Sequence, residues 1–223
     1  NPRRTYTFFL PVYVLLFIYM RRYGFLDWVV PESLLTNVLS TIGLSFLLFK
    51  ILHVMIEAGS GTLHKFDFLT FLNYCLNFTT FMMGPIQRYD DYYNQWHGVT
   101  KAIPNTLESH IDSAIRILVG LVKAYILAAW IQPYALLPGI NIEEMTIAEM
   151  FISIYAFYFF LFLNFSGYCD VVIGVGSFFG VRPPENFNKP YLARNASDFW
   201  LRQHRSLTLW LTDYVFSPLY KRT

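Results

Sequence analysis

The segment around His204 carries the side chains best suited to acid–base chemistry in this sequence. The spacing predicts a helix that begins near Phe199, on which Trp200, His204 and Leu207 share one face, continued by Trp210. Surroundings of low polarity lower the pKa of a histidine and keep the ring neutral, which is the form a general base needs. The alternative is a histidine that only hydrogen-bonds a neighbouring group.

The stretch before this helix is predicted to be an extended loop. Pro183-Pro184 and Lys189-Pro190 disfavour helical backbone at the residues that precede each proline. Ser197 or Asp198 could cap the helix that follows, because short side chains with an oxygen accept the free N–H groups of a first turn.

Two charged residues lie beside strongly apolar runs. Asp170 follows one such run, and a carboxylate at membrane depth is costly, needs a partner and is a candidate functional residue. Arg88 follows Gly84-Pro85, which breaks a helix at the membrane surface. The alternative for Arg88 is an ordinary interfacial anchor whose charge reaches the headgroups.

The composition excludes an ordinary soluble domain. Charged residues make up 14% of the 223 residues, against roughly 25% in soluble proteins. Aromatic residues make up 19%, and the net charge of +2 gives no field that would attract nucleic acid. Cys75 and Cys169 cannot form a disulfide framework or a zinc site, and no metal site is expected from the spacing of the five histidines. We read the four histidines other than His204 as hydrogen-bonded structural residues.

Five segments approach the roughly 20 apolar residues that a spanning helix needs. The predicted spans cover residues 5–20, 34–56, 66–83, 111–137 and 146–163. A sixth, glycine-rich stretch at 168–181 is short, and we predict a re-entrant or tilted element there, followed by a cytoplasmic loop and helix over 182–219. The predicted fold is therefore all-α: a single polytopic integral membrane domain over residues 1–223.

Counting Lys and Arg assigns the loops to sides of the membrane. With five spans, nine cations share one side and three lie on the other. The positive-inside rule makes the side with nine cations cytoplasmic. If residues 168–181 crossed fully, five of the nine would move outside, so the count argues against a full crossing there.

Read together, the polar motifs resemble the membrane-bound O-acyltransferase family, nearest to its members that acetylate alginate or attach D-alanine to teichoic acid. The residues that carry the resemblance run from residue 42 to residue 214: Ile42-Gly43-Leu44-Ser45-Phe46, Gly84-Pro85-Ile86 with Arg88, Phe165-Ser166-Gly167-Tyr168 with Asp170, Pro184-Glu185-Asn186-Phe187-Asn188 with Pro190, Phe199-Trp200, His204, Ser206-Leu207, Trp210 and Asp213-Tyr214.

The resemblance implies transfer of an acyl group, acetyl in the first place, from a thioester to a hydroxyl. The donor would be acetyl-CoA or an acyl-carrier protein on the cytoplasmic side, and no bound cofactor is implied. The acceptor would be an exported polysaccharide, reached directly or through an extracytoplasmic partner protein, at the inner membrane of a bacterium. His204 would be the catalytic residue. The substrate-binding or supporting residues would be Arg88, Asp170, Asn186, Asn188, Lys189, Trp200, Ser206, Trp210 and Asp213.

The sequence departs from the family pattern in several places. Gln203 stands where a tryptophan is usual and Thr212 where an arginine is common. A second family histidine is expected further along than Thr223, so we expect a fragment that lacks both ends and is inactive alone. Two other functions stay open: an inactive scaffold of the same fold, and a transporter or channel that would use Asp170 and a broken element at membrane depth.

Overall fold

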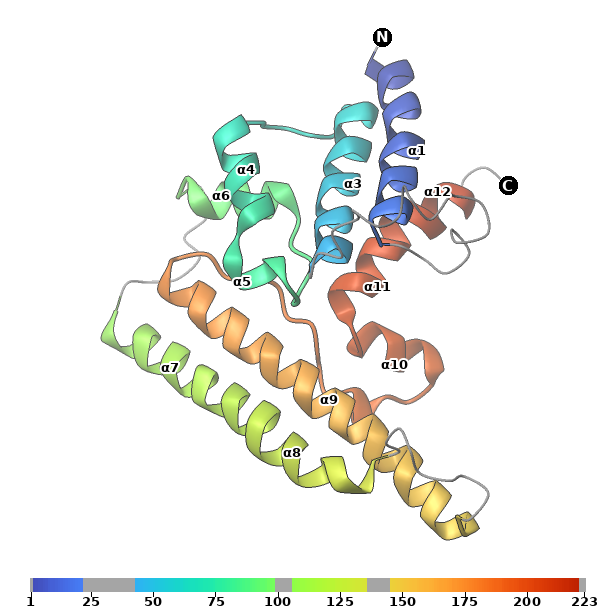
Figure 1. The fold of residues 1–223 in the computed structure, drawn as a ribbon. Helices are drawn as coiled ribbons and strands as arrows, with labels where there is room; N and C mark the ends of the chain where they lie inside the picture. Colours follow the sequence, from blue (N-terminus) through green and yellow to red (C-terminus); the bar gives the residue numbers. More distant parts are fainter. Residues whose placement is uncertain (1, 22–42, 99–105, 136–144, 221–223) are drawn as a thin grey trace. The chain divides into compact units, whose positions relative to one another are not determined.

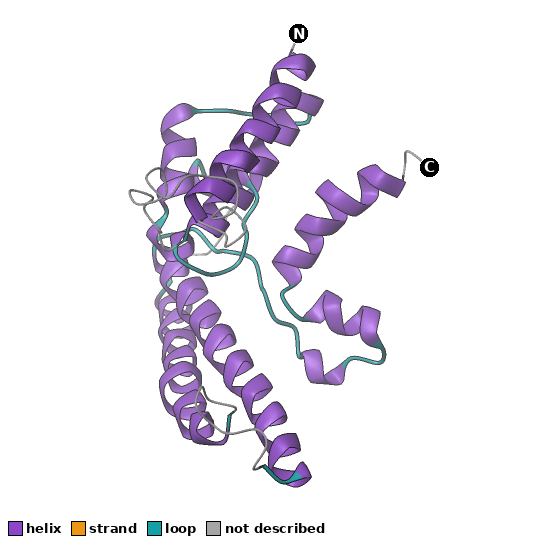
Figure 2. Cartoon of the chain, turned by 45° about the vertical axis from the view of Figure 1, so that its right-hand side comes forward, coloured by secondary structure: helices purple, strands orange, loops and turns teal. Residues whose placement is uncertain are grey.

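The structure is a computed structural model that describes residues 2–21, 43–98, 106–135 and 145–220, with the side chains of residues 2–8 left out. Within these ranges every regular element is helical and no strand occurs, as Figure 2 shows. This confirms the all-α fold class. A single domain was expected, and the chain divides into two compact units. Unit 1 holds residues 1–100 and 209–223, and unit 2 holds residues 101–208.

Unit 1 begins with two helices that pack against each other. Helix α1 covers Pro2–Arg21 and includes the segment predicted at residues 5–20, whose role as a span stays a prediction. Helix α3 covers Leu44–Ser60, while the first part of the span predicted at 34–56 falls outside the described residues. Gly43 takes a left-handed φ of 89° immediately before α3, where a β-carbon would lie 2.4 Å from the Phe81 carbonyl oxygen. Only glycine fits that position.

The span predicted at residues 66–83 is wrong as a single helix. The structure has α4 (Phe68–Leu76) and α5 (Phe78–Phe81), separated by Asn77, whose side chain accepts the N–H of Thr79. Nine residues of helix cover only about 13.5 Å, less than half of the hydrocarbon core. The break frees carbonyls at the end of α4, and the buried Lys50 satisfies that of Tyr74. Helix α6 (Tyr89–Trp96) follows.

Unit 2 is built on two long helices that lie side by side (Figure 1). The first is continuous from residue 107 to residue 134. It comprises α7 (Leu107–Leu121), a π-helical stretch (Val122–Leu127), α8 (Ala128–Ile131) and a 3-10 turn (Gln132–Tyr134). The second is α9 (Ile147–Phe178). Both are long and apolar enough to cross a membrane, in agreement with the predicted class of protein.

Helix α9 corrects the prediction of two separate elements at 146–163 and 168–181. It runs without a break through both segments, so no separate re-entrant element exists there. Gly167 lies inside the helix, opposite Gly120 of α7, where a β-carbon on either glycine would come within about 2.6 Å of the other's carbonyl oxygen. The glycines therefore serve close helix packing and do not end the helix. The charge count assumed that residues 66–83 form one of five spans, so the sides of the membrane stay a prediction.

The C-terminal part consists of short helices. A 3-10 turn (Pro190–Leu192) leads to α10 (Ala196–Arg202), α11 (Arg205–Leu211), a π-helical stretch (Thr212–Phe216) and α12 (Ser217–Tyr220). The single helix predicted from Phe199 onward is wrong, because the chain breaks at Gln203 and His204. The cap of α10 is Asn195, whose side chain accepts the N–H of Asp198, and neither Ser197 nor Asp198 takes that place.

Candidate functional site

His204 lies between two phenyl rings in unit 2. Its ring is 4.8 Å from that of Phe165 on α9 and 5.3 Å from that of Phe187 in the loop before α10. The predicted indole surroundings are wrong, because Trp200 lies on α10 before the break and 58% of it is exposed. Burial lowers the pKa of His204 below its ordinary value, as the sequence predicted for an apolar setting.

The left-handed backbone conformation of His204 sets the direction of its imidazole ring. His204 has a φ of 50°, which for a residue with a β-carbon costs about 1 kcal/mol or more and persists only where its surroundings hold it. Asn186 supplies part of that hold. Its carbonyl accepts the N–H of Arg205 at 2.8 Å, and its Oδ1 accepts the Ser206 hydroxyl at 2.8 Å and the Ser206 N–H at 3.2 Å. Two residues predicted for the site, Asn186 and Ser206, are thus brought together.

Asp170 has the partners that the sequence said it needs. Its Oδ1 accepts from Arg116 Nη2 at 3.0 Å and its Oδ2 accepts from Lys123 Nζ at 2.7 Å. Arg116 also donates two hydrogen bonds to Glu185, at 2.6 and 2.5 Å. These contacts join α7, α9 and the following loop. Sequence reasoning did not select Arg116 and Lys123 as partners, although a spacing of seven residues places two cations on one face of a helix.

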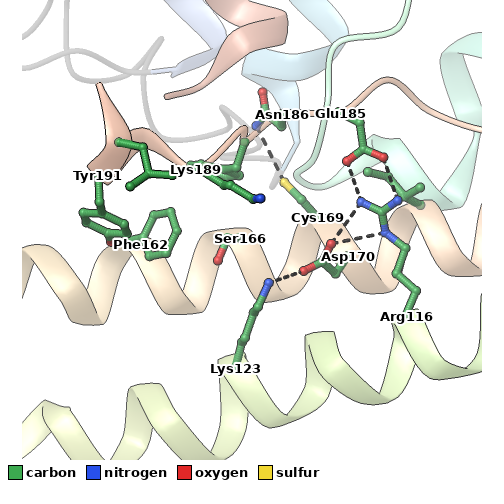
Figure 3. Close-up of a pocket in the computed structure, with 13 residues that line it drawn as sticks. Arg116, Lys123, Phe162, Ser166, Cys169, Asp170, Glu185, Asn186, Lys189 and Tyr191 are labelled. Carbon is green, nitrogen blue, oxygen red and sulfur yellow. Dashed lines mark hydrogen bonds and ion pairs between the residues drawn. The ribbon is translucent and has the colours of Figure 1, made fainter. Parts of the chain in front are cut away.

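The charge network borders a cavity of about 440 Å³ (Figure 3). Aromatic rings form part of its wall. Lys189 extends toward the space from the loop, and Lys123 from the π-helical stretch that follows α7. Ser166 is 4% exposed, and its hydroxyl has no hydrogen-bond partner among the described residues. The full lining is Arg116, Lys123, Phe162, Ser166, Cys169, Asp170, Ile173, Glu185, Asn186, Phe187, Lys189, Tyr191 and Leu192.

Among the described residues, one cation of the cavity lining has no counter-ion. Arg116 and Lys123 are matched by Asp170 and Glu185. Burial raises the pKa of Glu185, but the hydrogen bonds and charge of Arg116 outweigh this effect and hold the pKa below its ordinary value. In the described part of the chain no carboxylate lies within ion-pair distance of Lys189. The sequence predicted an extended backbone at Lys189, and this is wrong, because Lys189 is left-handed with a φ of 46°. The cavity can therefore hold an anionic group with an attached chain.

Three of the predicted residues form a separate cluster in unit 1. Arg88 pairs with Asp213, so Arg88 does more than anchor the chain at an interface. The neighbouring Tyr214 donates its hydroxyl to Glu57 of α3. Trp210 is 6% exposed and packs edge-on against the ring of Phe49, with 4.8 Å between the ring centres. Asp213 and Tyr214 lie in the π-helical stretch, a feature often found at functional sites.

Asn188 and Trp200 neither line the cavity nor belong to the cluster in unit 1. Asn188 is held through its backbone, whose N–H donates to the Arg202 carbonyl at 2.9 Å. Trp200 is exposed, and its carbonyl accepts the Thr208 hydroxyl at 2.9 Å. Their role at a site stays a prediction.

The other histidines have structural partners. The ring of His53 bridges the Phe49 carbonyl at 3.2 Å and the Tyr89 N–H at 3.0 Å, which confirms its reading as a hydrogen-bonded residue. His97 bonds the Thr70 hydroxyl at 3.0 Å. Within the described ranges no group of three His, Cys, Asp or Glu residues could hold a metal ion.

Comparison with known proteins identifies the family. The sequence model described as MBOAT, membrane-bound O-acyltransferase family, matches residues 7–223. The chain is 32% identical to a teichoic acid D-alanyltransferase of Bacillus subtilis, over 81% of this chain and 46% of the relative. It is 30% identical to a probable alginate O-acetylase of Azotobacter vinelandii, over 85% of this chain and 37% of the relative. A peptidoglycan O-acetyltransferase of Helicobacter pylori is also 30% identical, over 70% of this chain and 29% of the relative. The chain spans less than half the length of these curated relatives.

Proposed function

This chain belongs to the membrane-bound O-acyltransferase family, and on that premise we propose that its parent protein moves an acyl group from a cytoplasmic thioester to a hydroxyl of an exported polysaccharide. The acyl group is acetyl, and the enzyme lies in the inner membrane of a bacterium. The relatives named for alginate, peptidoglycan and teichoic acid support a cell-envelope polymer as the acceptor.

The observation that carries the proposal is the setting of His204. The ring is half-buried between Phe165 and Phe187, its pKa is lowered by burial, and neither ring nitrogen has a hydrogen-bond partner among the described residues. A neutral imidazole with a free nitrogen can accept a proton near neutral pH, and such general-base help contributes roughly 10²–10⁴-fold in rate.

The chemical step follows from these properties. The acceptor oxygen attacks the thioester carbonyl carbon while its proton passes to a nitrogen of His204. The carbon–sulfur bond then breaks, the thiolate leaves, and the proton on the imidazole returns to the sulfur. The products are an ester and a free thiol, and the histidine is restored. The phenyl rings around His204 exclude water that would compete with the acceptor.

The cavity beside His204 suits the donor. Phe187 touches the imidazole and also lines the cavity, so a thioester held there lies near the base. A volume of about 440 Å³ falls in the range of small-molecule sites. The unmatched charge of Lys189 would meet a phosphate of the donor arm, which acetyl-CoA and an acyl-carrier protein both present.

A transporter lacks support in this fold. That reading depended on Asp170 and a broken glycine-rich element at membrane depth. Helix α9 is unbroken there, and Asp170 is held by Arg116 and Lys123. An inactive scaffold remains as the alternative that the experiment must address.

The test compares acyl transfer by the full-length parent and by its His204→Ala and His204→Gln variants in membranes at matched protein levels. Each of acetyl-CoA and an acyl-carrier thioester is offered with alginate, peptidoglycan or teichoic acid as acceptor. We expect both variants to lose about a hundredfold in rate, while His64→Ala, at an exposed histidine, keeps wild-type transfer. Undiminished transfer by the His204 variants would remove His204 from the reaction. A wild-type parent without transfer to any acceptor would favour the scaffold.

A further inference from the structure

Arg116 joins three segments of unit 2 through one guanidinium. Its Nη1 and Nη2 donate to the two oxygens of Glu185 at 2.6 and 2.5 Å, and its Nε and Nη2 donate to Asp170 Oδ1 at 3.2 and 3.0 Å. Helix α7 thereby holds α9 through Asp170 and the loop after α9 through Glu185. Figure 3 shows the Glu185 carboxylate above the guanidinium and the Asp170 carboxylate to its left. Two-pronged contacts of this kind fix direction as well as distance.

The residue after Glu185 transmits this hold. Asn186 is 2% exposed, so its polar groups depend on protein partners. It binds the backbone of Arg205 and both the backbone and side chain of Ser206, and its Nδ2 lies 3.6 Å from Cys169 Sγ on α9. The two bonded residues come directly after His204. A shift of Glu185 therefore displaces the anchor of the turn that carries the imidazole.

His204 depends on that anchor because its backbone is strained. A φ of 50° is rare for a residue with a β-carbon, and α10 and α11 would otherwise join as one helix. As a helical residue His204 would point its ring elsewhere, away from Phe165 and Phe187. The contacts that hold the turn are therefore also the contacts that place the base.

From these contacts we infer that Arg116 is a positioning residue for His204. It fixes Glu185, which places Asn186, which holds the left-handed turn and keeps the imidazole between the two phenyl rings. Arg116 acts through these residues and does not itself touch the ring. The inference rests on the proposed function for its effect on turnover, but the placement of the ring can be measured without turnover.

Lysine cannot replace Arg116 in this role. The planar guanidinium of Arg116 contacts two carboxylates, Asp170 on α9 and Glu185 on the loop. A single ammonium group cannot make both sets of hydrogen bonds. Asp170 would keep Lys123 as a partner. In the part of the chain that the structure describes, Glu185 would keep only the exposed Arg182, at 3.2 Å. Loss of Arg116 should therefore release the loop more than the helix pair.

The experiment uses the full-length parent in membranes with the variants Arg116→Gln, Arg116→Lys and Glu185→Gln. Glu185→Gln leaves the bonds between Arg116, Asp170 and Lys123 in place, so it tests the loop anchor even if Arg116 variants insert poorly. Arg182→Gln is the matched control, because it removes the other, exposed cation that contacts the same carboxylate. Exposed ion pairs contribute little.

The first measurement is the rate at which diethyl pyrocarbonate modifies His204, read by peptide mass spectrometry with the exposed His64 as the internal reference. We expect Arg116→Gln and Glu185→Gln to raise the His204 rate about threefold or more, since losing these part-buried, charge-assisted hydrogen bonds raises the open fraction by about that factor. Arg116→Lys should give an intermediate rate, and Arg182→Gln the wild-type rate. An unchanged rate in both Arg116→Gln and Glu185→Gln would overturn the inference.

The second measurement is the kinetics of acyl transfer. A misplaced base should lower kcat about tenfold or more while KM for the donor changes little. A rise in KM alone would overturn the inference and make Arg116 part of the donor site. The two measurements also separate failures: a changed His204 rate in a parent that transfers no acyl group keeps the positioning role and rejects the proposed function. If acyl transfer needs His204 but the modification rate of His204 is unchanged in the variants, the proposed function is kept and the positioning role of Arg116 is rejected.

Discussion

Lys50 of α3 ends helix α4 by donating to the backbone carbonyl of Tyr74, with 2.9 Å between nitrogen and oxygen. The same ammonium donates to the Thr80 hydroxyl on α5 at 2.8 Å and lies 5.0 Å from the centre of the Tyr74 ring. Lys50 is 2% exposed. In a continuous helix the Tyr74 carbonyl would accept the N–H of Phe78, so the lysine replaces a lost helical bond.

The first prediction concerns this lysine. Lys50→Met should destabilise the protein by about 1–3 kcal/mol, because the Tyr74 carbonyl and the Thr80 hydroxyl stay buried without their donor. The measurement is the thermal unfolding midpoint of the detergent-solubilised full-length parent. Lys65→Met, at an exposed lysine, is the control and should leave the midpoint unchanged. Equal midpoints for the two variants would show that the Lys50 bonds do not support the break.

The second prediction is a pH dependence. Burial lowers the pKa of His204, and a general base works in its neutral form, so the rate is lost only as the pH falls through this lowered pKa. The acid limb of kcat should therefore lie below about pH 6.5, the ordinary value for histidine. Glu185 stays ionised across this range because Arg116 holds its pKa low.

Phe187→Ser tests the cause of this shift. It admits water beside the imidazole, so the acid limb should move up toward the ordinary histidine value. Phe159→Ser is the control, because Phe159 stacks on Tyr191 and has no ring contact with His204. A wild-type limb at or above pH 6.5 would contradict the prediction, and so would an unmoved limb in Phe187→Ser.

The third prediction concerns the unmatched cation of the cavity. Lys189→Ala should raise KM for the donor about tenfold or more with little change in kcat, since a charge-assisted hydrogen bond to a bound phosphate is lost. Initial rates over a range of donor concentrations measure both constants. Arg194→Ala removes an exposed cation from the same loop and should have a much smaller effect. Equal effects of the two variants would point to general attraction of anions and would remove Lys189 from the donor site.

The fourth prediction concerns the packing of α7 on α9. A β-carbon on Gly120 would lie 2.5 Å from the Gly167 carbonyl oxygen and 2.9 Å from Val171 N, both backbone atoms that cannot move aside easily. Gly120→Val should cost about 1–3 kcal/mol and lower the unfolding midpoint. Leu118 lies on the same helix and is 61% exposed, so Leu118→Val should change the unfolding midpoint little. An unchanged midpoint in Gly120→Val would mean that the close packing of α7 on α9 does not contribute to stability.

Several features of the fold follow from local sequence. The apolar run at 5–20 is long, uncharged and bracketed by arginines, and α1 has nearly the predicted bounds. Thr146 and Glu149 form a capping box that starts α9 at the predicted place. Asp170 was known to need a partner because an unpaired carboxylate is costly in an apolar setting, whatever the partner is.

The errors arise where a distant group decides a local conformation. The segment 66–83 is apolar enough for a span, but Lys50 and Asn77 satisfy the backbone groups that a break exposes. The short, glycine-rich stretch at 168–181 suggested a separate element, but α9 continues through it, and Gly120 provides a surface on which only a glycine packs closely.

The sequence by itself determined that this chain is a helical membrane protein with an O-acyltransferase pattern and with His204 in apolar surroundings, because composition, hydropathy and motif spacing are properties of the chain alone. Only the tertiary structure decided which surroundings those are. The periodicity of a helix placed His204 beside Trp200, whereas Asn186, eighteen positions earlier, binds the two residues after His204 and holds a left-handed turn there. Local preference favours a continuous helix, and the buried hydrogen bonds of Asn186 outweigh it.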